Sequence, residues 1–190
     1  MTAIIDRQVP AGSRGTDFRL RNGEMVRIRP VQPDDEDRLL EFLKSLSTES
    51  RKQRFFTAAA DLDWFAHEQS HVDYLDDFGL VATVAGRDEI VGHAMYARVA
   101  GDRAEVALEV ADAYQGQGLG TRLLELLIEI ASRNGVRVIE AEVLPENRPM
   151  LAVFRHYGTQ LDVRRRPSEL HVAFPAAVGT ASPGGRPTSE

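Results

Sequence analysis

Residues 104–127, AEVALEVADAYQGQGLGTRLLELL, decide the fold. The beginning alternates as a half-buried strand does, and the end is apolar at helical spacing. Between them lies a loop, residues 115–120, with glycine at every second position. A helix that begins directly after such a loop presents unpaired N–H groups and the positive end of its dipole. The unit therefore predicts an anion site that suits a pyrophosphate, where Arg122 either adds charge or faces solvent.

Two common phosphate-binding loops fit this segment poorly. The nucleotide P-loop requires Gly-Lys-Ser/Thr after its first glycine and four further residues, and no lysine stands there. The dinucleotide fingerprint finds its acidic partner in Glu140, but reading it from Gly116 puts Thr121 where a third glycine or alanine belongs. Strands with hairpin turns between them also precede the loop, whereas a dinucleotide domain begins at that strand. The loop therefore favours another phosphate ligand.

The rest of the chain mixes strand and helix patterns in a single domain. Hairpin turns at 86–89 and 101–102 indicate an antiparallel meander before the glycine loop. This order predicts a mixed α/β (α+β) fold with one strand-helix-strand crossover. We expect a flexible segment at 1–17, a folded domain at 18–174 and a disordered tail at 175–190. Strands are expected at 25–30, 78–85, 90–99, 103–111, 136–143 and within 160–174, and helices near 33–46, 47–56, 61–72, 118–133 and 147–157.

The amino-acid composition narrows the classes to which this protein can belong. The formal net charge of −6 opposes nucleic-acid binding and favours a cationic substrate. No apolar run approaches the roughly 20 residues of a membrane helix, so we expect neither a nucleic-acid nor a membrane partner. The chain has no cysteine, which removes thiolate chemistry and makes the cytoplasm the default location. His67 and His71 have a metal-binding spacing, but a solvated helix face explains them better, and no metal site is expected.

The loop Gln115-Gly116-Gln117-Gly118-Leu119-Gly120 matches the Q/R-x-x-G-x-G/A signature of the GNAT N-acetyltransferases at every fixed position. The later stretch led by Asn147, with Met150, Phe154 and Gly158, is also similar to the helix that flanks the CoA arm in that family. The resemblance covers about residues 25–174. It implies a mostly antiparallel sheet of six to seven strands with a V-shaped opening, four or so helices, and acetyl-CoA as the co-substrate.

The resemblance also implies which residues contact acetyl-CoA. Backbone groups of Leu108, Val110 and Ala111 at the end of the strand would bond the pantetheine arm. The amides of the loop, Gln115 to Gly120 and then Thr121, would hold the pyrophosphate. Asn147 either contacts the CoA arm or caps the helix that it begins, and the sequence does not decide between these roles.

Acetyl transfer to an amine needs a base, for which a carboxylate with a raised pKa is suited. Strand alternation places Glu105 and Glu109 on one face, roughly 13 Å apart, too far to share a proton. The resemblance favours Glu105 as the base and makes Glu109 the second choice, while either is otherwise an exposed strand carboxylate. Many relatives carry a tyrosine as general acid where this chain has Phe154, which leaves Tyr157, Tyr114 or water to protonate the thiolate.

The N-terminal part, with Ile28-Arg29-Pro30, residues 46–51 and Arg54-Phe55-Phe56, resembles the bacterial Pat-type protein lysine acetyltransferases. This implies transfer to a protein lysine, for example on an acyl-CoA synthetase. Two alternatives stay open: a small-molecule amine as the acceptor, and a non-catalytic module that binds acyl-CoA and regulates a partner. A homodimer is a further possibility.

Overall fold

The computed structural model describes residues 15–155 and 160–176 of the 190-residue chain. Its sheet has the strand order β1-β2-β3-β4-β5-β6-β8-β7, and every neighbouring pair is antiparallel except β5 and β6. The mixed, mostly antiparallel α/β fold is therefore confirmed. The strands are β1 Thr16–Arg19, β2 Met25–Pro30, β3 Asp77–Val84, β4 Ile90–Ala100, β5 Arg103–Val110, β6 Val138–Val143, β7 Asp162–Arg165 and β8 Leu170–Pro175.

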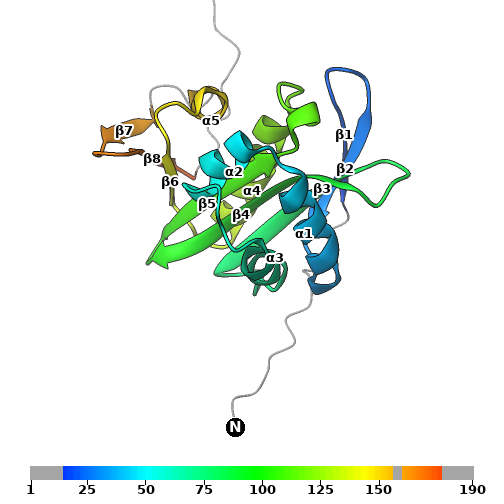
Figure 1. Ribbon diagram of the computed structural model, residues 1–190. Helices are drawn as coiled ribbons and strands as arrows, with labels where there is room; N and C mark the ends of the chain where they lie inside the picture. The colour runs from blue at the N-terminus through cyan, green and yellow to red at the C-terminus, as the bar shows by residue number, and fades with distance from the viewer. Residues whose placement is uncertain (1–14, 156–159, 177–190) are drawn as a thin grey trace, which may run out of the picture.

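Helices cover both faces of the sheet, with α1, α2 and α3 in front of it and α4 behind it in Figure 1. The apolar stripe of α4 is fully buried, as its helical spacing predicts. Short helix α5 lies beside the open edge of β6 (Figure 1). The helices are α1 Glu36–Ser45, α2 Thr48–Phe55, α3 Leu62–Ser70, α4 Leu119–Arg133 and α5 Arg148–Phe154, with single 3-10 turns at Pro33–Asp35 and Asp112–Tyr114.

The two parallel strands β5 and β6 diverge, and this is the feature that makes room for a site. Their pairing runs only from Arg103↔Val138 to Glu105↔Glu140. Beyond that point β5 stays paired with β4 up to Val110, and β6 stays paired with β8. The sheet therefore opens as a V between the remainder of β5 and the remainder of β6, as the resemblance implied.

Both expected chain boundaries need correction. Thr16 and Asp17 belong to β1, which pairs with β2, so order begins inside the segment that we expected to be flexible. A turn at Asn22-Gly23 joins these strands, with Gly23 at φ 91°. At the other end, Pro175 is part of β8 and Ala176 is fully buried. With β1 included, the described sheet has eight strands instead of six or seven.

Two other expectations concern the chain ends and the membrane. Tyr157 and Gly158, at the end of the expected helix 147–157, lie outside the described residues, as does the tail from 177 onward. Among the described residues, no helix has the length and apolarity needed to cross a membrane.

Candidate active site

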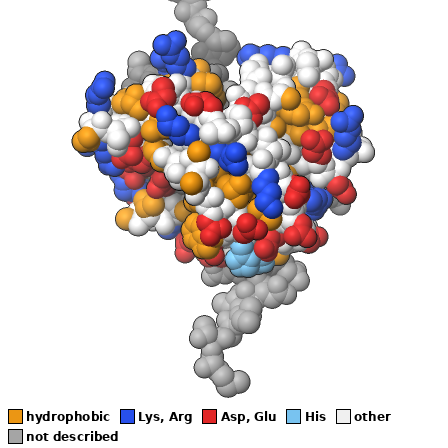
Figure 2. Space-filling view, viewed as in Figure 1, with side chains coloured by type: hydrophobic (Ala, Val, Ile, Leu, Met, Phe, Trp, Pro, Cys, Tyr) orange, Lys and Arg blue, Asp and Glu red, His pale blue; other side chains and the backbone are white. Residues whose placement is uncertain are grey.

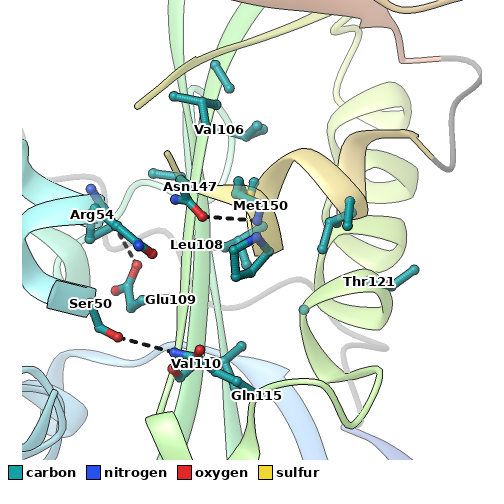
Figure 3. A pocket seen from close by; sticks show the side chains of 18 of the residues that line it. Ser50, Arg54, Val106, Leu108, Glu109, Val110, Gln115, Thr121, Asn147 and Met150 are labelled. Atoms are coloured by element: carbon teal, nitrogen blue, oxygen red, sulfur yellow. Dashed lines mark hydrogen bonds and ion pairs between the residues drawn. The ribbon is translucent and has the colours of Figure 1, made fainter. Parts of the chain in front are cut away.

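A cavity of about 400 Å³ fills the V between β5 and β6. Its walls come from β5, the glycine loop, β6, α5 and the polar face of α2. Figure 3 shows these walls, with Arg54 and Ser50 of α2 on one side and Thr121 of α4 on the other. The segments that we expected to bind acetyl-CoA and the two candidate bases are therefore brought together around one opening.

The glycine loop has the backbone geometry that its composition predicts. Gly116 has φ 71° and Gly118, which caps the N-terminus of α4, has φ 90°. Both values lie in the left-handed region, which disfavours residues with a Cβ. A Cβ on Gly120 would stand 3.5 Å from the Leu108 side chain, an ordinary van der Waals distance, so α4 packs against β5 here without requiring a glycine. The loop thus presents the start of α4 to the cavity, where an anion is favoured.

Not every predicted loop residue faces the cavity. Gln115, Gly116, Gly118, Gly120 and Thr121 line it. The Leu119 side chain is buried in the core, and the Gln117 carbonyl accepts a hydrogen bond from the Arg21 N–H at 3.2 Å. The backbone amides of these two residues remain predicted pyrophosphate contacts.

The open edge of β5 carries the backbone groups that we expected to contact the pantetheine arm. The Ala111 N–H donates to the Val91 carbonyl of β4 at 2.9 Å, so it is not free to bond the pantetheine arm as we expected. Because backbone groups alternate in direction along a strand, the N–H groups of Val110 and Leu108 point the opposite way, toward the gap. The hydrogen bond from Gln115 Nε2 to the Val110 carbonyl, 3.1 Å, lies on that side.

Asn147 caps α5, which was one of the two roles left open by the sequence. Its Oδ1 accepts a hydrogen bond from the Met150 N–H at 3.0 Å (Figure 3). The residue also lines the cavity. The cap fixes the start of α5 against the opening, and the side-chain amide nitrogen is the part of Asn147 that a ligand would meet.

Glu109 is held in a buried ion pair. Its side chain is 3% exposed, and one oxygen lies 2.5 Å from Arg54 Nε of α2. The other oxygen lies 2.9 Å from Nδ1 of His93, which is fully buried. Burial alone would raise the pKa of Glu109, but the charges and hydrogen bonds of Arg54 and His93 lower it. A carboxylate with both oxygens engaged and a lowered pKa is a poor base, which weighs against our second choice.

Glu105 has the opposite environment on the same face of β5. The residue is exposed to the open cavity, yet partial desolvation raises the pKa of its carboxyl group. The negative charges of Glu142 and Glu140 on β6 also raise this pKa, whereas Arg54 and His171 lower it. Its side chain lines the cavity. The two carboxylates of β5 are thus pushed apart in pKa, which is the pattern of a site where one of them exchanges protons.

Several polar contacts attach helix α2 to the site. The structure describes all of its residues, and none is buried. The Asp112 carboxylate accepts hydrogen bonds from Ser47 Oγ at 2.7 Å and from Ser50 Oγ at 2.8 Å. Gln115 Nε2 donates to Ser50 Oγ at 3.2 Å, which is visible in Figure 3. The first residue of the glycine loop is therefore bonded directly to the helix that forms the opposite wall.

A comparison of the sequence with protein-family models identifies the family of this chain. The model of the acetyltransferase (GNAT) family matches residues 37–159. The chain belongs to the GNAT family. It is 33% identical over 135 residues to acetyltransferase PA5475 of Pseudomonas aeruginosa, covering 69% of this chain and 73% of that protein. GNAT enzymes are N-acetyltransferases, and the resemblance drawn from the glycine loop is confirmed.

Two Pat proteins are also similar to this GNAT chain. Acetyltransferase Pat of Mycolicibacterium smegmatis is 32% identical over 142 residues, or 74% of this chain, which spans only 43% of that longer protein. The crystal structure of the GNAT domain of S. lividans PAT matches with a TM-score of 0.79 and 34% identity, covering 88% of this chain and 99% of that domain. The likeness to Pat-type GNAT domains is confirmed.

Three residues of the GNAT site were missed at the sequence level. Arg21 lines the cavity, and its Nη1 donates to the Gly116 carbonyl at 3.2 Å, which sets a cation beside the loop. The Asn22-Gly23 turn was the signal for the hairpin that places it. Arg54 and Phe56 of the α2 region also line the cavity, but no local pattern shows which strand α2 will cover.

Two other charged groups lie away from the cavity lining. Arg122 Nη1 is 3.3 Å from Glu125 on the same helix. His67 and His71 meet Glu36 of α1, with His67 Nδ1 3.1 Å from the Glu36 carboxylate, and all three side chains are substantially exposed.

Proposed function

We propose that this chain transfers the acetyl group of acetyl-CoA directly to the side-chain amine of a protein lysine, with Glu105 as the general base. The observation that carries the proposal is the position of Glu105: its side chain lines the same cavity as the glycine loop, and its pKa is raised. The pyrophosphate would bind at the start of α4, beside Arg21. The pantetheine arm would extend along the open edge of β5, next to Leu108 and Val110.

The proposed reaction accounts for each bond and each proton with Glu105 and solvent. The lysine nitrogen forms a bond to the acetyl carbon while its proton passes to the Glu105 carboxylate, directly or through water. The carbon–sulfur bond then breaks and CoA leaves as a thiolate, which takes up a proton. Phe154, at the position of the usual tyrosine, is fully buried and cannot donate one. Tyr114 is absent from the residues that line the cavity, and Tyr157 lies outside the described residues; we propose solvent as the source of this proton.

The protein acceptor is supported by the likeness to the two Pat proteins, and a small amine is the alternative acceptor. A non-catalytic module that binds acyl-CoA is the alternative from another class. The experiment is to incubate the protein with acetyl-CoA and either an AMP-forming acetyl-CoA synthetase or a panel of small amines, and to follow CoA release and the mass of each acceptor.

The proposal predicts CoA release coupled to acetylation of a synthetase lysine, and loss of both in the Glu105→Gln variant. Tight acetyl-CoA binding without turnover on any acceptor would overturn the enzymatic role. Turnover confined to small amines would overturn the protein acceptor. A loss of rate in Glu109→Gln, with Glu105→Gln unaffected, would move the base to Glu109.

A further inference from the structure

Four aromatic residues lie at the end of α2 and in the first turn of α3. Phe55 and Phe65 are partly buried, with ring centroids 4.5 Å apart, and Trp64 meets Phe65 edge-on at 4.9 Å. Phe56 and Trp64 remain 43% and 53% exposed. We call Phe55, Phe56, Trp64 and Phe65 the aromatic surface. Figure 2 shows the face of the molecule that carries α2 and α3, where hydrophobic side chains lie among charged ones.

The backbone at Phe56 has an unfavourable conformation. Phe56 ends α2 with φ 60° and ψ 5°, a left-handed conformation. Glycine is the usual residue at such a helix end, and for a bulky residue this conformation is an outlier that costs about 1–3 kcal/mol. Strain of this kind persists mainly at functional sites, and Phe56 lines the cavity. Of the aromatic surface, Phe56 is therefore the residue that reaches the active site.

The aromatic surface adjoins the acceptor side of the site and not the acetyl-CoA side. Phe56 follows α2, which covers the face of β5 that carries Glu105 and Glu109, whereas α4 packs on the opposite face at Leu108. The surroundings of Trp64 are acidic, because Asp61, Asp63 and Glu68 are all exposed. An apolar surface with an acidic border suits a partner segment that combines apolar residues with a lysine.

We propose that Phe56 and Trp64 dock the acceptor protein beside the lysine that enters the cavity. This inference rests on the proposed function, and it makes the partner the surface of a folded protein. Phe56 packs against the methylene stem of the lysine at the mouth of the cavity. Trp64 packs against an apolar side chain next to that lysine, outside the cavity. A small amine occupies only the cavity and does not reach Trp64, so the two kinds of acceptor respond differently to substitution.

The test compares two acceptors, an AMP-forming acetyl-CoA synthetase and Nα-acetyl-lysine methylamide. For Trp64→Ala we expect kcat/KM to fall about tenfold or more on the synthetase, as for an aromatic anchor of an interface, and to stay within about twofold on the small amine. For Phe56→Gly we expect kcat/KM to fall on both acceptors with no loss of thermal stability, because glycine relieves the backbone strain. Val99→Ala, at a side chain 51% exposed outside the cavity lining, is the matched control and should change neither rate.

Several results would overturn the docking proposal while the proposed chemistry stood. One is an unchanged kcat/KM on the synthetase in Trp64→Ala. Another is an equal fall of kcat/KM on both acceptors in that variant. A third is wild-type turnover of the small amine but not of the synthetase. A chain that is dimeric by light scattering, and monomeric after Trp64→Ala, would show that a second copy covers this surface instead. If neither acceptor is turned over, the proposed function fails. Docking is then tested by the affinity for the synthetase, which Trp64→Ala must weaken about tenfold.

Discussion

The ion pair between Arg54 and Glu109 offers a prediction whose size follows from burial. The two side chains are 12% and 3% exposed, and they join α2 to β5. Replacing Arg54 with Met leaves the Glu109 carboxylate buried with only the His93 hydrogen bond at 2.9 Å. Removing one partner of a buried pair costs about 3–5 kcal/mol. Because His93 stays in contact, we expect the free energy of unfolding to fall by about 3 kcal/mol at pH 7.

Urea denaturation is the assay, and the same helix contains a control. Lys52 lies 3.5 Å from Glu146, but these side chains are 49% and 52% exposed. Exposed pairs contribute about 0–1 kcal/mol, so Lys52→Met should change the unfolding free energy little. The double variant Arg54→Met/Glu109→Gln removes the stranded charge and should recover part of the loss.

The pH dependence provides a second signature of the same pair. In the wild type the folded-state pKa of Glu109 is lowered. Its contribution is therefore present above the unfolded-state pKa and is lost as the pH falls through the folded-state value. Without Arg54, burial would dominate and raise the folded-state pKa, so the destabilisation should shrink as the pH falls. Equal effects of Arg54→Met and Lys52→Met, or additive effects of the two changes in the double variant, would refute this reasoning.

Three further predictions concern the loop, the base and the core. Gly118→Ala should weaken acetyl-CoA binding and lower the free energy of unfolding by about 1–2 kcal/mol. The cause is the backbone angle φ of 90° and not a clash, because the atom nearest to a new Cβ is 3.8 Å away. Calorimetry measures the binding and thermal melting the stability, and unaltered binding would contradict the loop geometry. Glu142→Gln removes a like charge and should move the acidic limb of kcat/KM, assigned to Glu105, to lower pH; a shift to higher pH would contradict it. Asp35→Asn should cost about 3 kcal/mol, because the fully buried carboxylate accepts hydrogen bonds from Arg29 at 2.6 and 2.7 Å; urea unfolding unchanged by this substitution would refute that role.

Sequence patterns predicted the fold wherever burial follows a regular period. The apolar spacing of α4 and the hairpin turns before β5 predicted the order of elements and the single strand-helix-strand crossover. β1 was missed because its residues are mostly exposed, and an exposed edge strand shows no alternation. Its place depends on pairing with β2, which is a tertiary effect.

The candidate site was predictable on the side of acetyl-CoA and less so on the side of the acceptor. The glycine loop is local, so its residues and their left-handed backbone could be inferred from the motif. The difference in pKa between Glu105 and Glu109 could not be inferred from the sequence, because both side chains lie on the same face of β5. It depends on Arg54, which is distant in the sequence and reaches only Glu109 within hydrogen-bonding distance.

We propose that Glu105 removes the proton from the amine in this cavity. The most direct measurement is the pH profile of kcat/KM for acetyl transfer to Nα-acetyl-lysine methylamide and to the synthetase, in the wild type and in Glu105→Gln. On the acceptor that is turned over, we expect kcat/KM of the wild type to rise with pH through a pKa above the ordinary range of a carboxylate. We also expect a variant about 10²–10⁴-fold slower without that limb, but with unchanged acetyl-CoA affinity. A variant that keeps the wild-type rate and the same limb would contradict the proposal.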